Sequence, residues 1–171
     1  MIKLIEPSIE YEAEFSKMVE DYNIHKENTF EDVYYKEDFD FNKYIKTLKD
    51  FSKGEGLPRD YAQSTELWLV NDKKEILGTI RIRHSLKNKN FYEGGNIGYD
   101  ISPRFRKMGF GRIILKFALD KAKNLGLSKV LLTCDYDNIG SKKIIEYNGG
   151  VLENIIEREH GNKILRYWIS L

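Results

Sequence analysis

The sequence is poor in cysteine and has no long apolar run. Its single cysteine, Cys134, cannot form an internal disulfide, and no cluster of Cys and His has zinc-like spacing. No stretch approaches the ~20 apolar residues of a membrane-spanning helix. Acidic residues interrupt the first twenty positions, which lack the basic start and apolar run of a secretory signal. We therefore expect a cytoplasmic protein with no membrane partner and no metal.

A strong net charge is also missing. The 171 residues include 28 Lys and Arg against 27 Asp and Glu, a net charge of +1. Because a nucleic-acid-binding domain would be strongly basic, we expect no nucleic-acid partner. Residues 1–61 hold 9 basic and 15 acidic residues, whereas the remainder holds 19 and 12. Two interpretations stay open: an acidic side that attracts a cation, or acids that lie on a solvated helical segment.

Two phosphate-binding fingerprints are absent. No Gly-x-x-x-x-Gly-Lys-Ser/Thr run occurs, so a Walker-type loop is excluded. The segment that begins Gly109-Phe-Gly111 lacks the third glycine of the dinucleotide fingerprint. The acidic residue expected ~20 positions later would fall at a helix end instead of on a strand. Nicotinamide chemistry is therefore a poor fit.

Length and hydrophobic periodicity predict one α/β domain over residues 1–171. We expect strands at 2–7, 67–70, 76–83, 96–101, 129–134, 151–157 and 163–170, and helices at 9–22, 40–53, 110–125 and 138–147. The predicted fold class is α/β (α+β), a single mixed and mostly antiparallel twisted sheet of about seven strands with helices on both faces.

The segment between strand 96–101 and helix 110–125 has features of an anion site. The first turn of a helix leaves about four backbone N–H groups without partners, and the helix dipole adds positive potential there. Gly109 and Gly111 carry no side chain where a ligand would approach the main chain. Four basic residues would raise the local potential: Arg104, Arg106, Lys107 and Arg112. A pyrophosphate fits this description, and the alternative is an ordinary strand-to-helix turn with solvated basic residues.

These residues resemble the fingerprint of the GCN5-related N-acetyltransferases. That family has a proline two residues after a hydrophobic strand and then Arg/Gln-x-x-Gly-x-Gly/Ala at the start of a helix, which Arg106-Lys-Met-Gly109-Phe-Gly111 matches. The family's next helix begins at an Asn, with a small residue three positions later and a Gly eleven later, here Asn138, Ser141 and Gly149. The two blocks cover roughly 97–150, and the runs around them are similar to a poorly characterised bacterial branch of predicted acetyltransferases.

The resemblance implies acetyl-CoA as the acyl donor and an amine as the acceptor, with direct attack on the thioester. The strand residues Tyr99, Asp100 and Ile101 would bind the pantetheine arm, and Asn138 would touch the same region. The loop that Arg106 opens would hold the pyrophosphate through the amides of Lys107, Met108, Gly109, Phe110, Gly111 and Arg112. The resemblance leaves the acceptor open, and the acidic N-terminal half favours a cationic one. A homodimer is compatible with the resemblance.

The groups that move protons are less evident. Direct attack needs a neutral amine, and the departing thiolate takes up a proton. Many relatives place a tyrosine seven residues after the helix-opening Asn, but this chain has Ile145 there. We therefore consider Tyr136 for the acid and Glu93 for the base, since some relatives carry a glutamate at the position of Gly95; a water chain is the alternative. The missing tyrosine also leaves open an acyl-CoA-binding sensor or interaction module without turnover.

Three other features have a structural and a functional interpretation. Cys134 is expected to be a small core residue in place of an acyl-accepting nucleophile. His84 is expected to be structural instead of substrate-binding. The aromatic residues of 27–44 form either part of a core or a cage for a cation, and packing in a core is the more frequent outcome.

Overall fold

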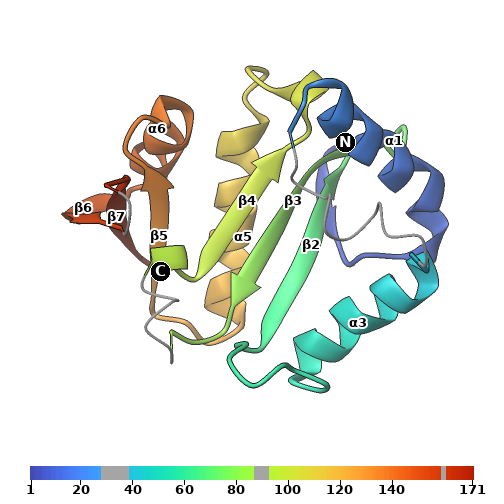
Figure 1. Ribbon diagram of the computed structural model, residues 1–171, viewed down its shortest axis with the longest axis horizontal. Coiled ribbons are helices and arrows are strands. Elements are labelled where there is room, and N and C mark those ends of the chain that lie inside the picture. The colour runs from blue at the N-terminus through green and yellow to red at the C-terminus, as the bar shows by residue number, and fades with distance from the viewer. Residues whose placement is uncertain (28–38, 87–92, 159–160) are drawn as a thin grey trace.

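The computed structural model describes residues 1–27, 39–86, 93–158 and 161–171. Every predicted strand and helix is present, with shifts of a few residues at the ends (Figure 1). In chain order the elements are β1 (Lys3–Ile5), a 3-10 turn (Ile9–Tyr11), α1 (Glu12–Ile24), α3 (Phe41–Lys53), β2 (Ser64–Val70), β3 (Ile76–Arg83), β4 (Ile97–Ile101), a 3-10 turn (Pro103–Phe105), α5 (Phe110–Asn124), β5 (Lys129–Asp135), α6 (Ile139–Tyr147), β6 (Val151–Glu157) and β7 (Lys163–Ser170). Among the described residues, no helix is long and apolar enough to cross a bilayer.

The helices begin and end where local side chains satisfy the free backbone groups. The carboxylate of Asp40 accepts a hydrogen bond from the Lys43 amide at 3.0 Å and caps α3. In the same way, the Asn138 side chain accepts from the Ser141 amide at 2.9 Å and caps α6. Gly126 follows the end of α5 with φ +86°, a left-handed conformation that suits glycine. These local signals explain why the predicted helix boundaries were nearly correct.

The seven strands form two sheets, so the prediction of one continuous sheet was wrong. The first sheet has the order β1-β2-β3-β4 and the second β5-β7-β6, and all of these pairings are antiparallel. β4 and β5 lie next to each other and run in the same direction, but they move apart toward their C-terminal ends (Figure 1). No ladder of backbone hydrogen bonds joins β4 to β5 in the described part of the chain.

The two sheets are joined at Asn96, immediately before β4. Its N–H donates to the Leu131 carbonyl at 2.7 Å, and its side-chain oxygen accepts from the Leu131 N–H at 2.9 Å. The preceding residue, Gly95, has φ +66°, and a Cβ placed on it would overlap the Leu131 carbonyl oxygen. The side-chain amide of Asn96 therefore takes the place of the next backbone partner of Leu131. The backbone pairing of the two strands ends at Asn96, and beyond this residue β4 and β5 move apart.

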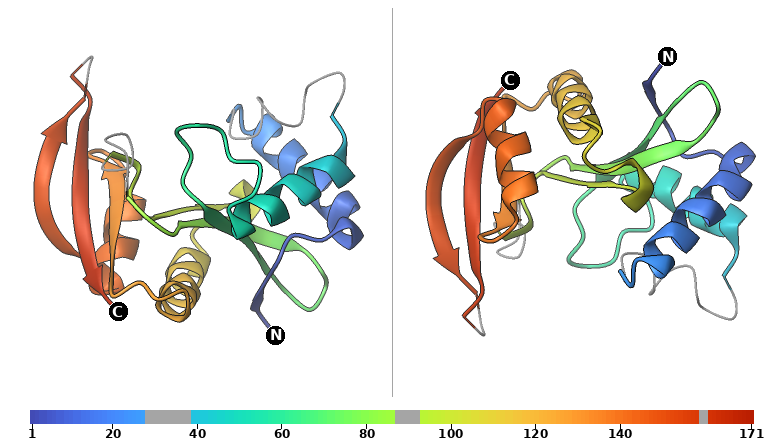
Figure 2. Two further views of the ribbon diagram at one scale, coloured as in Figure 1. Left: turned by 90° about the horizontal axis from the view of Figure 1, so that it is seen from below. Right: turned by 90° about the horizontal axis from the view of Figure 1, so that it is seen from above.

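Both faces of the first sheet are covered, as predicted. Side chains alternate along β2, so Leu67 and Leu69 pack toward α5, whereas Trp68 and Val70 pack toward α1 and α3. Figure 2 shows α5 on one face and α1 with α3 on the other. Two apolar cores result, and the free edge of β4 lies beside the junction between the two sheets.

Candidate functional site

The loop from Ser102 to Gly109 leads from the end of β4 directly into α5. Its first part is a tight turn, in which the Phe105 amide donates to the Ser102 carbonyl at 2.8 Å. Lys107 and Gly109 then adopt left-handed conformations with φ values of 61° and 88°. A Cβ placed on Gly109 would meet no heavy atom within 4 Å. The main chain at Gly109 is therefore open to an approaching ligand.

Five successive backbone N–H groups of this loop have no acceptor within the described residues. They belong to residues 107–111. The next amide, that of Arg112, donates to the Gly109 carbonyl at 3.1 Å, so this row of amides ends at residue 111. Unpaired amides at the positive end of a helix dipole are a favourable environment for phosphate oxygens. The geometry therefore supports an anion site made of main-chain donors.

The side chain of Arg106 is held by acidic groups at the end of β4 and after α1. Its guanidinium forms a two-point ion pair with Glu27, including an Nη2 to Oε2 distance of 2.8 Å. Its Nε donates to the Ile101 carbonyl at 2.9 Å, and its Nη2 lies 3.3 Å from Asp100 Oδ1. Arg106 thus connects the end of β4 to the segment after α1, and these contacts hold the start of the loop in place.

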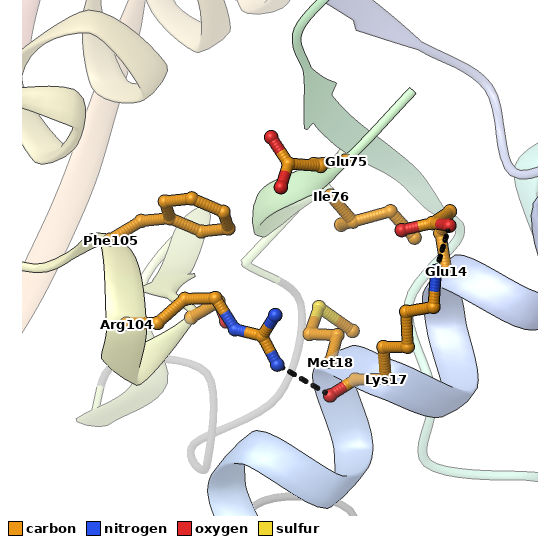
Figure 3. Close-up of a pocket in the computed structure, with 8 residues that line it drawn as sticks. Glu14, Lys17, Met18, Glu75, Ile76, Arg104 and Phe105 are labelled. Carbon is orange, nitrogen blue, oxygen red and sulfur yellow. Dashed lines mark hydrogen bonds and ion pairs between the residues drawn. The ribbon is translucent and has the colours of Figure 1, made fainter. Parts of the chain in front are cut away.

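Arg104 is also engaged by α1. Its Nε lies 3.4 Å from Asp21 Oδ2. Figure 3 shows the second contact, in which its Nη2 donates to the Lys17 carbonyl at 3.3 Å. The acidic N-terminal half therefore uses Asp21 and Glu27 to neutralise arginines of the loop. This pairing accounts for part of the charge asymmetry in the sequence without a cationic ligand.

Asp21 is the buried anchor of the loop. Its carboxylate is 5% exposed and accepts from the Ser102 hydroxyl at 2.8 Å and from the Arg104 amide at 2.9 Å. Burial alone would raise the pKa of this carboxyl, but the hydrogen bonds from Arg104 and Ser102 and the Arg104 charge lower it below its usual value. Asp21 thus stabilises the folded loop as an anion.

We expect Asp21→Asn to lower the free energy of unfolding at pH 7 by about 1–3 kcal/mol, since a buried charged acceptor is lost. A lowered pKa in the folded state means that this stabilisation is complete above the unfolded-state pKa near ~3.9 and is lost as the pH falls through the folded-state pKa. The difference between wild type and variant should therefore shrink in urea unfolding below about pH 4. Asp50→Asn, which removes only an exposed pair with Lys46, is the control and should cost less than ~1 kcal/mol. An unchanged difference at pH 3 would contradict the assignment.

Close packing of α5 against α6 explains Gly111. A Cβ on Gly111 would overlap the Cδ1 atom of Ile144 in α6, so the absent side chain lets the two helices pack closely. Nearby, the guanidinium carbon of Arg112 lies 4.2 Å from the centre of the Tyr147 ring. Three of the four basic side chains expected to attract phosphate are therefore engaged by other groups, and Lys107 alone is exposed without an interaction in the described residues.

On the α5 side of β4, Tyr99 reaches across to α6. Its hydroxyl lies 2.9 Å from Ser141 Oγ, and burial raises the pKa of Tyr99 to about 12. Cys134 lies in the same core, and burial raises the pKa of its thiol, which supports its interpretation as a core residue. Ile145 is fully buried there. No proton donor can therefore come from position 145.

Glu93 and Tyr136 lie in different surroundings. The Glu93 carboxylate is 3.5 Å from the Nε of Arg158, and its carbonyl accepts from Thr133 Oγ1 at 2.8 Å. Tyr136 follows β5 and is 55% exposed. The structure does not bring these two side chains into contact, and their catalytic roles stay predictions. The position at which some relatives carry a glutamate, Gly95, cannot take a side chain without displacing β5.

The other sequence interpretations concern structural residues. His84 is 2.9 Å from Thr65 Oγ1, and burial lowers the pKa of its ring. Phe41 and Tyr44 pack against Phe15 with ring centroids 5.3 and 5.4 Å apart, so these aromatic residues belong to a core. Phe39 packs against Phe41 and Tyr44, with ring centroids 6.5 and 5.9 Å apart. The other aromatic residues of 27–44 lie outside the described residues: Phe30, Tyr34 and Tyr35.

Comparisons with known proteins agree with this geometry. Residues 17–149 match the family described as the acetyltransferase (GNAT) family. No curated protein matches the sequence. Two similar solved structures are the microcin self-immunity acetyltransferase MccE in complex with acetyl-CoA and AMP (15% identity, 99% of this chain and 92% of that chain, TM-score 0.70) and the spermidine N-acetyltransferase of Vibrio cholerae in complex with CoA and spermine (16%, 99% and 95%, 0.65). At these identities the likeness shows the fold alone.

Proposed function

Because the chain belongs to the GNAT acetyltransferase family, we propose that it transfers an acetyl group from acetyl-CoA directly to the nitrogen of an amine. The observation that carries this proposal is the row of five N–H groups at residues 107–111 for which the described part of the chain offers no acceptor. They form a cradle for a pyrophosphate, and Gly109 leaves the main chain there open. The residues present therefore fit acetyl-CoA, the substrate that the family uses.

The free edge of β4 supports the same assignment. Among the described residues, β4 pairs only with β3, so backbone groups of Tyr99, Asp100 and Ile101 can bind the pantetheine arm. Asn138 lies at the start of α6, and its side-chain oxygen already caps that helix. A contact from Asn138 to pantetheine would thus use its amide nitrogen. Acetyl-CoA supplies an activated thioester, and this chain positions it.

Acetyl transfer also requires two proton movements. An alkylamine with a pKa around ~10 must lose a proton before attack, and the leaving thiolate gains one. As the sequence suggests, we propose Glu93 as the base that deprotonates the amine and Tyr136 as the acid that protonates the thiolate. Tyr99 is a further donor candidate, because its hydroxyl lies between β4 and α6 and keeps its proton at neutral pH.

Calorimetry with CoA and acetyl-CoA tests the proposal first, and thiol release with a panel of amines tests it second. We expect saturable heats of binding and amine-dependent release of CoA. The absence of heat at millimolar concentrations would refute the proposal. Binding without thiol release would instead indicate an acyl-CoA-binding module without turnover. The observation in favour of this alternative is the buried Ile145 at the position where many relatives carry a tyrosine.

A further inference from the structure

β4 contains a glycine, Gly98, at a position where neither the backbone nor the packing requires one. Gly98 pairs with Arg81 of β3 in a regular antiparallel register, and its φ lies outside the left-handed region. It is exposed, and a Cβ placed on it would meet no heavy atom of the described residues within 4 Å. A glycine within a strand costs stability, because it loses more conformational freedom on folding and offers no side chain to pack.

The glycine of the neighbouring strand, Gly78 of β3, has a structural explanation that Gly98 lacks. A Cβ on Gly78 would overlap the backbone carbonyl oxygen of Asp100, so the pairing of β3 with β4 needs a glycine there. A glycine within a strand marks a bulge, the close approach of another backbone or the close approach of a ligand. At Gly98 the regular register excludes the first, and the open space excludes the second among the described residues. The approach of a ligand is the remaining explanation.

Gly98 also lies where the proposed donor would carry its reactive group. The loop of residues 102–109 follows the C-terminal end of β4, so a pantetheine arm along the free edge of β4 would run from this loop back toward Asn96. β4 and β5 are apart at the loop end, and the hydrogen bonds between Asn96 and Leu131 close the space between them at the other end (Figure 1). The thioester at the far end of the arm would therefore lie beside residues 97 and 98.

The face of β4 toward α5 is filled by side chains of the strand itself. Ile97 and Ile101 are buried in the core beneath α5, and Tyr99 packs against the same core. Because side chains alternate along a strand, Gly98 and Asp100 belong to the opposite face. An acceptor that comes from the α5 side would have to displace core residues, so it has to come from the opposite face.

On that opposite face, the opening is at Gly98. Asp100 is held by Arg106, with Oδ1 and Nη2 3.3 Å apart. Arg81, which lies beside Gly98 on β3, pairs with Glu66 and leaves its side chain 46% exposed, so solvent reaches this part of the face. A molecule that moves from solvent to the thioester would thus cross the strand at Gly98.

We propose that the acceptor amine reaches the thioester over Gly98, and that the missing side chain at this position determines how wide an acceptor the site admits. This inference rests on the proposed acetyl transfer. The amine nitrogen forms a bond to the acetyl carbon while the thioester C–S bond breaks. Of the two protons that an ammonium acceptor loses, one passes to solvent and the other ends on the sulfur of CoA. A side chain at position 98 would stand between the nitrogen and the acetyl carbon.

A series of larger side chains at position 98 tests the proposal: Gly98→Ala, Gly98→Val and Gly98→Leu. The thiol-release assay uses n-butylamine as a narrow acceptor and benzylamine as a wide one. Since a misplacement of about 1 Å can cost roughly 100-fold, we expect kcat/KM to fall along the series and to reach a loss of about 100-fold with leucine. The loss should appear at a smaller side chain for benzylamine than for n-butylamine. Calorimetry should give the wild-type affinity for CoA, because the donor binds backbone groups at the strand edge.

Urea unfolding separates a passage for the acceptor from a structural need for glycine. Gly98→Val should keep or raise the urea midpoint, since a β-branched residue suits an exposed strand position. Gly78→Ala is the contrasting variant and should lower the midpoint, because its methyl group would overlap the Asp100 carbonyl oxygen.

Three results would overturn the role of Gly98 and leave the acetyltransferase function intact. They are an unchanged kcat/KM for both amines across the series, a loss of CoA affinity that accounts for the loss of activity, and a lower urea midpoint for Gly98→Val. A wild-type protein that binds no acetyl-CoA, or that releases no thiol with any amine of the panel, would instead refute the transfer on which the inference rests.

Discussion

Replacement of Gly109 by valine should weaken CoA binding by at least about 100-fold. Gly109 has φ +88°, and its missing side chain leaves the approach to the loop amides open. A branched side chain would occupy that space and would also strain the backbone by about 1–3 kcal/mol. Loss of two amide-to-phosphate bonds, at about 1.5–3 kcal/mol each, is sufficient for the expected effect. Calorimetric titration with CoA measures it.

Gly126→Val is the matched control for that experiment. Gly126 has nearly the same conformation, φ +86°, and no heavy atom lies within 4 Å of an added Cβ, but it follows the opposite end of α5. The two variants should lose similar amounts of stability in thermal unfolding, and only the Gly109 variant should lose affinity. Equal affinity of both variants for CoA would mean that the ligand does not contact the loop at Gly109.

Gly95→Ala should lower the free energy of unfolding by about 3 kcal/mol or more. The residue has φ +66°, and the new methyl group would overlap the Leu131 carbonyl oxygen. Backbone strain of about 1–3 kcal/mol adds to an overpacking cost of similar size. The backbone of β5 cannot move away without breaking the two hydrogen bonds between Asn96 and Leu131. Urea unfolding followed by circular dichroism gives the difference.

The adjacent residue provides a control of the same chemistry. A Cβ on Gly94 would meet only the Arg83 guanidinium at 3.8 Å, which is ordinary contact. Gly94→Ala should therefore change stability by less than ~1 kcal/mol. If Gly95→Ala were as stable as Gly94→Ala, the junction between the sheets would tolerate displacement, and the separation of β4 from β5 would not depend on this contact.

Acidic residues of the N-terminal half of the chain hold the loop after β4, which belongs to the C-terminal half. Asp21 accepts hydrogen bonds from Ser102 and Arg104, and Glu27 pairs with Arg106. These ion pairs neutralise the charges of Arg104 and Arg106 and hold the main chain of the loop in place. Phosphate binding at this loop would then depend on amide direction more than on side-chain charge, so affinity for CoA should fall only modestly with added salt.

Local patterns in the sequence determined the secondary structure and the position of the loop that carries the family fingerprint. Apolar spacing of 3.6 residues defined α5, the continuous apolar run at 129–134 defined β5, and Asn138 and Gly126 marked helix ends through their own backbone chemistry. These features depend on residues within a few positions of one another. The family fingerprint at Arg106–Gly111 is equally local, which is why the sequence alone pointed to an acyltransferase.

Tertiary structure alone decided the division into two sheets and the partners of the charged residues. Asp21 and Ser102 are 81 positions apart, and Glu27 and Arg106 are 79 apart, so no local pattern could pair them. The side-chain amide of Asn96 reaches the backbone of Leu131 because Gly95, which has no side chain, lies against β5. The pairing of β4 with β5 ends at this contact. Such contacts depend on how folded elements meet in space, and they decide which arginines of the loop are paired with acidic side chains.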